Sequence, residues 1–395
     1  MISIIDKYQC CGCEGCVQVC PKQCISFGED SEGFRYPVVD EAICINCGLC
    51  EKVCPVQNQA EKRTPLKVYA AKNQNEEELL ASSSGGLFIF FAKKIIAEGG
   101  VVFGAKFDSR WEVVHSYADD LEGVYELMRS KYAQSRMGTS YLDAKEFLKD
   151  GKTVLFVGTS CQIAGLKRFL GKEYENLITM DVVCHGVPSP KIWRRYLEEL
   201  KQDVATKKNK QVEIRNISFR DKQSGWKKFS IVFTFAFPSG DGNDKTISIS
   251  RMHREDAFMK LFLTDLILRP SCYQCPSRGG KSQSDLTIAD FWGIENIIPE
   301  YYDERGVGLL MVNSPKGLKM LDDDILSVKE VSLDDATKRN PCYFSSKLEP
   351  KNRAECFRRL DANGARIDGV AQIMFHVSFF TRLKSKFKVI IKDFI

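Results

Sequence analysis

The cysteines of this chain are concentrated near its beginning and follow a regular spacing. Ten of the 16 cysteines in the 395 residues lie between Cys10 and Cys54. Eight of these ten form two copies of the pattern C-x2-C-x2-C-x3-C-P: Cys10, Cys13, Cys16 and Cys20, then Cys44, Cys47, Cys50 and Cys54. This doubled spacing is typical of bacterial ferredoxin domains that bind two 4Fe–4S clusters.

In such domains each cluster takes three thiolates from one run and the fourth from the other run. We therefore expect one cluster on Cys10, Cys13, Cys16 and Cys54, and the second on Cys44, Cys47, Cys50 and Cys20. The fourth cysteine of each run is expected to open a short helix. Two zinc sites are the alternative, but zinc requires neither the doubled pattern nor the trailing prolines. Cys11 and Cys24 lie outside the pattern and are predicted to be small apolar fillers.

The charge of the chain is distributed unevenly. Residues 1–60 have a net charge of −4, so the rest of the chain carries +9 within the overall +5. A basic body could attract an acidic electron-transfer partner, although an ordinary solvated surface is the simpler interpretation. Lys and Arg are scattered along the chain rather than clustered with aromatic residues, so nucleic-acid binding is not favoured. We expect a cytoplasmic protein, because the sequence has no signal-peptide pattern and no apolar stretch of about 20 residues.

Further along the chain, two predicted strands bring two more cysteines together. The strand-like segments 153–157 and 177–183 flank a helical segment at 162–169, which is a β–α–β pattern with parallel strands. Cys161 and Cys184 each follow the end of one of these strands. Because parallel strands end at the same edge of a sheet, both thiols are expected at the edge where open α/β sheets bind ligands.

Cys272 and Cys275, followed by proline, supply two further thiols in a C-x2-C arrangement. Together with Cys161 and Cys184 they make four thiolates, which suit a third 4Fe–4S cluster or a tetrahedral zinc ion. We favour iron–sulfur because the chain already contains two such motifs. Ordinary buried cysteines are the plainer alternative.

The remaining cysteines and the histidines give less specific signals. Cys342 and Cys356 have no partner at a ligand spacing and are predicted to be structural. His185 adjoins Cys184 and either tunes a nearby cofactor or caps a turn. The other three histidines have no ligand-like context: His115, His253 and His376.

A Ser/Gly-rich turn at residues 82–86 precedes a predicted apolar helix at 87–97. Such a turn offers backbone amides and hydroxyl groups to the phosphates of a nucleotide. A serine N-cap followed by flexible glycines is the equally simple alternative. No G-x-G-x-x-G motif occurs, so a Rossmann dinucleotide site is not predicted. Segments 211–219, 229–237 and 245–250 are predicted to form an antiparallel meander.

Several motifs together resemble one family. GTSCQIAGLKRFLG (158–171), DVVCHGVPSPKIW (181–193), DLTIADFWG (285–293) and the Cys272/Cys275 pair are similar to the coenzyme F420 hydrogenase/dehydrogenase beta-subunit family, as are SSSGGLF (82–88) and RSKYAQS (129–135). The resemblance covers about residues 67–315. Ser160 departs from the proline that is usual in the family.

Members of this family are iron–sulfur flavoproteins, so the resemblance implies a non-Rossmann FAD site beside a 4Fe–4S cluster. It implies that this third cluster is held by Cys161, Cys184, Cys272 and Cys275. The FAD contacts that it implies are Ser83, Ser84, Gly85, Gly86, Lys131, Tyr132, Gln134 and Ser135.

The sequence therefore predicts an α+β protein in three parts. These are a ferredoxin-like two-cluster module at 1–60, a mixed α/β flavin-binding body at 67–315, and a C-terminal extension at 316–395. Within the extension, residues 377–395 are basic and amphipathic, which predicts either a docked helix or weak contact with a membrane surface.

The predicted function is that of an iron–sulfur flavoprotein oxidoreductase. Electrons would pass between a ferredoxin, or another electron-transfer protein, and a small-molecule substrate, for which deazaflavin is one candidate. A non-catalytic relay subunit of a larger redox or polysaccharide-biosynthesis system is the alternative, and a flavin-free cluster protein is a further one. Whether the chain forms a homo-oligomer stays open.

Overall fold

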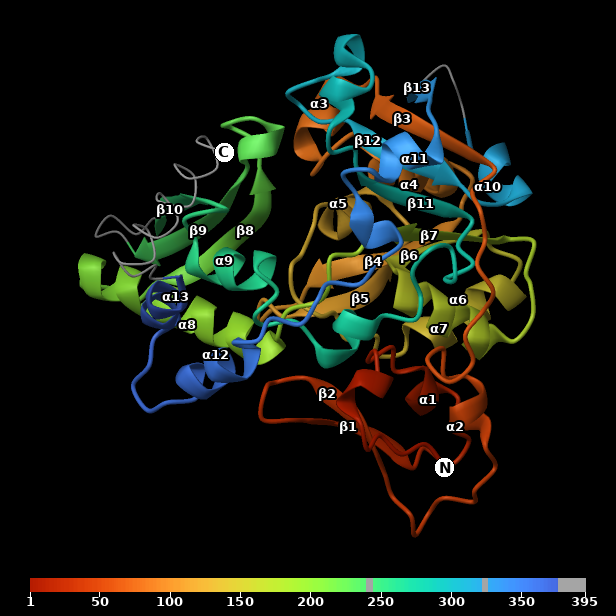
Figure 1. Ribbon diagram of the computed structural model, residues 1–395, viewed down its shortest axis with the longest axis horizontal. Helices are drawn as coiled ribbons and strands as arrows, with labels where there is room; N and C mark the ends of the chain where they lie inside the picture. The colour runs from red at the N-terminus through yellow and green to blue at the C-terminus, as the bar shows by residue number, and fades with distance from the viewer. Residues whose placement is uncertain (239–243, 322–325, 376–395) are drawn as a thin grey trace, which may run out of the picture.

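The computed structural model describes residues 1–238, 244–321 and 326–375. Three parts are visible in Figure 1: a small N-terminal domain, an eight-stranded sheet with its helices, and a three-stranded sheet with its own helices. Among the described helices, none has the length and apolar character needed to cross a bilayer. The basic tail at 377–395, predicted to dock or to contact a membrane, lies outside the described residues, as does His376.

The N-terminal domain contains a hairpin and two short helices. Strands β1 (Ile25–Glu29) and β2 (Arg35–Val39) pair in an antiparallel register. Helices α1 (Gly15–Gln18) and α2 (Leu49–Lys52) contain the third cysteine of each run, and the fourth follows each helix. The prediction that the fourth cysteine opens a helix is therefore wrong. Each helix begins earlier because its N-cap residue, at φ 58° or 74°, turns the chain before the third cysteine.

The central sheet has eight strands in the order β13-β3-β12-β11-β7-β6-β4-β5. Strands β11, β7, β6 and β4 run parallel, and the outer strands are antiparallel to their neighbours. The bounds are β3 (Lys67–Asn73), β4 (Val101–Phe107), β5 (Val113–Ala118), β6 (Val154–Thr159), β7 (Leu177–Val182), β11 (Leu286–Asp290), β12 (Gly308–Val312) and β13 (Leu326–Glu330). The predicted β–α–β unit is confirmed, because Thr159 of β6 pairs with Val182 of β7 in parallel.

Both faces of the parallel strands are buried against helices. On β6, Leu155 and Val157 pack into the apolar cluster that contains α4 and α5, whereas Val154 and Phe156 pack into the one that contains α6 and α7. The continuous apolar run of this strand is what burial on both faces requires. The helices of this part are α3 (Glu76–Ala81), α4 (Leu87–Ala97), α5 (Leu121–Leu127), α6 (Ser140–Lys149) and α7 (Ser160–Leu170).

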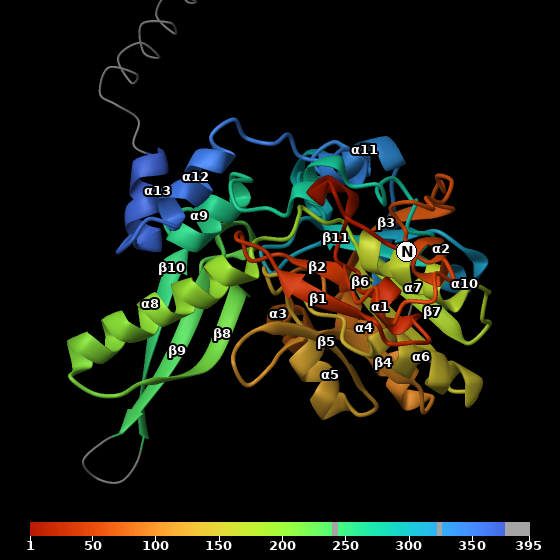
Figure 2. The ribbon, with the colours of Figure 1, turned by 90° about the horizontal axis from the view of Figure 1, so that it is seen from below.

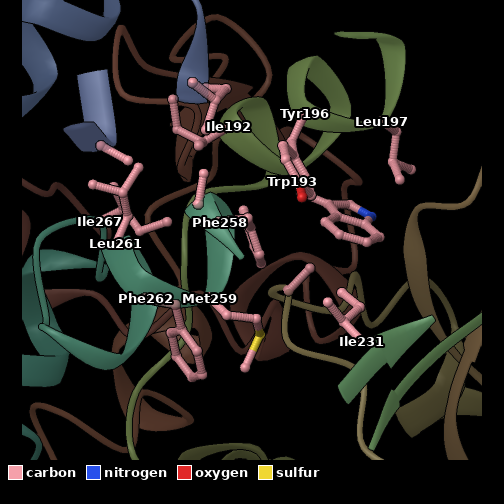
Figure 3. Close-up of a cluster of buried hydrophobic side chains, with 14 of the residues drawn as sticks. Ile192, Trp193, Tyr196, Leu197, Ile231, Phe258, Met259, Leu261, Phe262 and Ile267 are labelled. Carbon is pink, nitrogen blue, oxygen red and sulfur yellow. The ribbon is translucent and has the colours of Figure 1, made fainter. Parts of the chain in front are cut away.

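The three-stranded sheet, in the order β10-β9-β8, is the predicted antiparallel meander. Its strands are β8 (Glu213–Asp221), β9 (Ser230–Pro238) and β10 (Asp244–Met252). It shares one apolar core with α8 (Pro190–Lys208), which runs alongside its strands (Figure 2), and with α9 (Ala257–Leu263), α12 (Arg353–Leu360) and α13 (Ile367–Phe375). Figure 3 shows the centre of this core, where Trp193 and Tyr196 of α8 lie near Phe258 of α9.

The described residues after 315 take part in both sheets' cores. Strand β13 extends the central sheet by pairing with β3, and α12 and α13 join the core of the three-stranded sheet. Two short helices complete this region, α10 (Pro315–Lys319) and α11 (Leu333–Thr337). Short 3-10 helices occur at Lys7–Gln9, Trp226–Lys228, Pro270–Gln274, Ile294–Asn296, Pro299–Tyr301 and Pro341–Tyr343.

The N-terminal domain caps a helix of the body. The side-chain oxygen of Gln18 accepts hydrogen bonds from the backbone N–H groups of Tyr141 (2.9 Å) and Leu142 (3.2 Å) in the first turn of α6. Glu14 accepts a further one from the N–H of Gly138 at 3.1 Å. The first amides of a helix have no partner within it, so these contacts satisfy buried donors and fix the domain in place.

Candidate functional site

Four cysteines from separate parts of the chain line one small cavity. Cys161 lies in the first turn of α7, directly after β6, and Cys184 follows the end of β7. Cys272 lies in the 3-10 helix Pro270–Gln274, and Cys275 follows it. The parallel pairing of β6 with β7 brings the first two thiols to one edge of the sheet, as predicted, and the C-x2-C turn completes the set.

The pKa values of these thiols are raised. Burial raises the pKa of Cys272 to about 12 and that of Cys275 to about 11, and it raises the pKa of Cys184 well above the usual range. The pKa of Cys161 is raised first by a hydrogen bond with the thiol of Cys11 and then by burial. Nucleophilic cysteines need a lowered pKa, whereas buried thiols lose their protons when a metal centre binds. The raised pKa values therefore argue against nucleophilic chemistry at these thiols.

A buried guanidinium group lies in the same cavity. Arg278 donates from Nη1 to the carbonyl oxygen of Cys184 at 2.8 Å and to that of Cys342. Its Nε has no hydrogen-bond partner within the described part of the chain. An arginine keeps its charge at any physiological pH, so it can offset the negative charge of thiolates gathered beside it.

Two further cysteines line this cavity, although the sequence pattern assigned neither of them to it. Cys11 comes from the N-terminal domain, and interactions with the thiols of Cys13 and Cys161 shift its pKa, which is raised well above its usual value. Burial acts to raise the pKa of Cys342, but His185 and nearby positive charges outweigh it and lower that pKa. The Nε2 of His185 lies 2.7 Å from a carboxylate oxygen of Asp265.

The thiols of the N-terminal domain gather in two groups. Cys20, Cys44, Cys47 and Cys50 line a separate cavity within the domain, which also contains Cys24. In the other group, burial and the neighbouring thiols of Cys10 and Cys54 raise the pKa of Cys16. Cys20 thus lies with the second run and Cys54 beside Cys16 of the first, while the crossed assignment of cluster ligands stays a prediction.

A larger cavity of about 640 Å³ lies between the central sheet and the three-stranded sheet. The end of β6 at Gly158 and the end of β11 at Asp290 form part of one side, and Arg220 and Phe229 form part of the other. The volume is within the range of cofactor and small-molecule sites. The position, at the carboxyl ends of parallel strands, is where open α/β sheets bind ligands.

Seven of the eight residues that the resemblance implies as FAD contacts line this larger cavity. They are Ser83, Ser84, Gly85, Gly86, Lys131, Tyr132 and Ser135. The eighth, Gln134, lines the four-cysteine cavity instead, where its Nε2 donates to the carbonyl oxygen of Cys11 at 3.1 Å.

The Ser/Gly turn leaves the start of α4 without a side-chain cap. Gly86 is the N-cap residue, with φ 77°, so the alternative of a serine N-cap does not apply. The hydroxyl groups of Ser83 and Ser84 bond elsewhere, to the N–H of Ser130 and to the carbonyl oxygen of Val307. Within the described ranges, no side chain caps the first amides of α4, which can therefore bind an anion.

Among the titratable side chains that line this cavity, Lys131 and His115 have strongly lowered pKa values. Burial lowers the pKa of Lys131 to about 7 and that of His115 to about 4. His115 is therefore neutral. It donates from Nε2 to the carbonyl oxygen of Val157 at 2.8 Å, which leaves Nδ1 to accept from the hydroxyl of Ser135 at 3.0 Å. No motif or spacing placed His115 here, and His253 also lines the cavity.

A buried ion pair joins the two sheets at the larger cavity. Arg220 of β8 is 4% exposed and donates from both Nη atoms to the carboxylate of Asp290 on β11, at 2.9 and 2.8 Å. Asp290 also accepts from the indole N–H of Trp226 at 2.8 Å. The Nε of Arg220 has no partner among the described residues. No spacing in the sequence links these side chains, because the contact depends on how the sheets pack.

The two cavities share a wall. Six residues line both of them: Thr159, Gln162, Val183, Cys184, Gly186 and Val187. One of the four thiols thus belongs to both cavities, so groups bound in the two would be neighbours.

Comparison with family models gives two matches. Residues 9–58 match the model of the 4Fe–4S dicluster domain. Residues 151–337 match the model described as the C terminus of the beta subunit of coenzyme F420 hydrogenase/dehydrogenase. Two successive parts of the chain are thus similar to a 4Fe–4S dicluster domain and to the C-terminal part of F420 hydrogenase/dehydrogenase beta subunits. The resemblance seen in the sequence is thereby confirmed, and so is the fold class of a ferredoxin-type module followed by an α/β body.

The solved structures that resemble the chain include a chain of the F420-reducing [NiFe] hydrogenase complex from Methanosarcina barkeri, studied with xenon, with 16% sequence identity and a TM-score of 0.43. The match covers 76% of this protein and 93% of that chain. No curated protein sequence matches significantly.

The family matches define the general activity. The F420 hydrogenase/dehydrogenase match spans Cys161, Cys184, Cys272 and Cys275, and the dicluster match spans both N-terminal runs. The protein is an iron–sulfur protein of the oxidoreductase type that transfers electrons.

Substituting the ion pair of Arg220 and Asp290 tests how strongly this contact between the two sheets stabilises the protein. We expect Asp290→Asn to destabilise the protein by about 3–5 kcal/mol, because it leaves the buried charge of Arg220 without its partner. Anaerobic urea unfolding would measure the difference from the unsubstituted protein.

The matched control is an exposed ion pair on the three-stranded sheet, which also contains Arg220. It joins Asp244 to Arg215 at 3.0 Å, and both side chains are about half exposed. Asp244→Asn is expected to cost under about 1 kcal/mol. Equal unfolding midpoints for the two variants would contradict the role assigned to the buried pair.

Proposed function

We propose that this protein is an iron–sulfur flavoprotein oxidoreductase. In this proposal a third 4Fe–4S cluster is held by Cys161, Cys184, Cys272 and Cys275, and FAD binds in the larger cavity. The observation that carries the proposal is the shared wall, because Cys184 lines both cavities. A cluster and a flavin on either side of one wall could exchange electrons directly.

The chemistry of the smaller cavity suits a cluster. A cubane separates its cysteine ligands by its own iron and sulfide atoms, so its thiolates surround a cavity instead of converging on one point. Among the described residues, no three His, Cys, Asp or Glu side chains converge closely enough to hold a single metal ion. The buried charge of Arg278 would offset the negative charge of a cluster with four thiolates.

The larger cavity suits a flavin nucleotide. The uncapped start of α4 offers backbone amides to a diphosphate, and Lys131 lies in the same cavity. The unpartnered Nε of Arg220 is a further buried donor on its lining. Aromatic side chains such as Phe229 and Phe262 line the cavity as well, and they would exclude water from an isoalloxazine ring.

A two-electron reaction needs a group that can change between one- and two-electron transfer. Bound FAD would exchange single electrons with a cluster and a hydride equivalent with a substrate. The role of the chain's own residues would be to bind the flavin nucleotide and to orient it. The amides of the first turn of α4 would fix the diphosphate, and neutral His115 would hold Ser135 in place by the hydrogen bond between them.

The partners of the proposed reaction would bind at opposite ends of this path. Cys47 is exposed in the N-terminal domain, where a ferredoxin or another electron-transfer protein would exchange electrons. The substrate would enter the larger cavity. A deazaflavin is one candidate, because the matched family is described by its coenzyme F420.

Cofactor content tests the proposal. Protein purified without oxygen is expected to contain about twelve iron atoms, at four per cluster, and one releasable FAD per chain. Cys184→Ser and Cys272→Ser should each lower the iron content to about eight, because each removes one ligand of the third cluster. Iron analysis and the absorbance spectrum of released flavin measure both quantities.

The control is Cys342→Ser, which changes a thiol of the same cavity that is outside the proposed ligand set. It should keep about twelve iron atoms. A content of about eight in the unsubstituted protein, or the same content in all three variants, would rule out the third cluster. Absence of flavin would rule out the FAD site.

The shifted pKa of Lys131 predicts a pH dependence of flavin binding. The free site loses the charge of Lys131 as pH rises through about 7. A bound diphosphate would hold the proton and raise that pKa, so the affinity for FAD should fall as pH rises above 7, by about tenfold between pH 7 and 8.5. Equilibrium titration of flavin-depleted protein with FAD measures this change.

Lys131→Met should weaken binding at pH 6 and remove most of the pH dependence. Lys227, which lines the same cavity and is paired with Glu295 at 2.6 Å, provides the control. Lys227→Met should keep the pH profile of the unsubstituted protein. An unchanged profile in Lys131→Met would show that this lysine does not act on the diphosphate.

A further inference from the structure

The N-terminal domain meets the four-cysteine cavity at one fully buried arginine. Arg269 has no solvent exposure. Its Nε donates to the carbonyl oxygen of Cys10 at 2.7 Å, its Nη2 to that of Arg35 at 2.9 Å, and its Nη1 to the side-chain oxygen of Gln134 at 3.0 Å. The three nitrogen atoms of this guanidinium group thus connect the first cysteine run to the body by hydrogen bonds.

Gln134 continues this contact along the cysteine run. Its Nε2 donates to the carbonyl oxygen of Cys11 at 3.1 Å. The next residue is Gly12, at φ 71°, where a Cβ atom would lie 2.5 Å from the Nε2 of Gln134 and 3.0 Å from the Nη1 of Arg269. The backbone of residues 10–12 can approach the two side chains this closely only because residue 12 is glycine.

The same contact reaches both sets of thiols. Cys11, next to Cys10 in the chain, lines the smaller cavity together with Cys161 and Cys272. Arg269 precedes Cys272 by three residues, and its charge interacts with both Cys10 and Cys272. The junction of Arg269, Gln134 and residues 10–12 therefore lies between a predicted ligand of the first N-terminal cluster and the proposed ligands of the third.

We propose that this junction is where electrons cross between the N-terminal domain and the body, and that Arg269 is the positioning residue of that step. The inference rests on the proposed third cluster. In the step one electron leaves the reduced cluster on Cys10, Cys13, Cys16 and Cys54, which is oxidised by one equivalent. The cluster on Cys161, Cys184, Cys272 and Cys275 is reduced by one equivalent, and no bond or proton changes place.

Arg269 acts on this step in two ways. Its hydrogen bonds hold Cys10 and the segment before Cys272 in one rigid arrangement, which sets the distance that an electron must cross. Its permanent positive charge stabilises the more negative, reduced state of a neighbouring cluster and so raises the potential of that cluster.

The test compares Arg269→Met, which removes the charge at similar length, with Arg269→Lys, which keeps the charge but loses the three-way hydrogen bonding. The readouts are an anaerobic redox titration followed by EPR, and the spin–spin broadening between reduced clusters. In Arg269→Met we expect the ratio of the reduced to the oxidised form of a cluster beside this residue to fall about tenfold at a fixed potential. This fall corresponds to a reduction potential that is lower by about 59 mV for a one-electron couple. Arg269→Lys should restore most of this potential but not the full broadening.

Arg353 provides a matched control, because it is also a buried arginine that joins the N-terminal domain to the body. It pairs with Glu32 at 2.6 Å and donates to the carbonyl oxygen of Leu268 at 2.9 Å, with no bond to the cysteine backbone. Arg353→Met should loosen the docking without lowering the cluster potential. Gln134→Ala is a second variant at the junction in case Arg269→Met does not fold, and it should reduce the broadening.

The outcomes separate this inference from the proposed function. About eight iron atoms in the unsubstituted protein would refute the third cluster itself. About twelve iron atoms, with potentials and broadening in Arg269→Met equal to those in Arg353→Met, would overturn the junction while leaving the third cluster in place. Unchanged broadening in Gln134→Ala would overturn it as well.

Discussion

The parallel pairing of β6, β7 and β11 is the constraint on which the rest of the structure depends. Because these strands run in one direction, Cys161, Cys184 and Asp290 all lie at or beyond the same edge of the sheet. The four-cysteine cavity and the larger cavity both open from that edge, and this is why they share a wall. An antiparallel β7 would send Cys184 to the opposite edge and separate the two cavities.

Buried charges then fix the other two parts of the molecule against this edge. Arg269 and Arg353 hold the N-terminal domain, and the pair of Arg220 and Asp290 holds the three-stranded sheet. A buried charge is costly unless it is paired with good geometry, so such contacts form in one arrangement and tolerate little displacement. For a protein that transfers electrons this matters, because the distance between redox groups must be held constant.

The sequence predicted what local patterns can encode. It predicted the doubled cysteine spacing, the alternation of strand and helix around Cys161, and the meander, because each of these depends on neighbouring residues. It did not predict the contacts between distant segments of the chain. Cys342 has no spacing signal, and Gln134, grouped with the flavin contacts by its motif, reaches the other cavity because its side chain turns toward Cys11. The pairing of Arg220 with Asp290 likewise follows from how two sheets pack.

In the proposed function, the two N-terminal clusters, the four-cysteine cavity and the larger cavity form one continuous path for electrons. Anaerobic titration with a one-electron reductant, followed by flavin absorbance and EPR, tests this most directly. We predict that about five electrons are taken up per chain, one for each of three clusters and two for FAD, with the flavin absorbance bleached. Uptake of about two electrons, with no flavin bleaching and only two cluster signals, would contradict it.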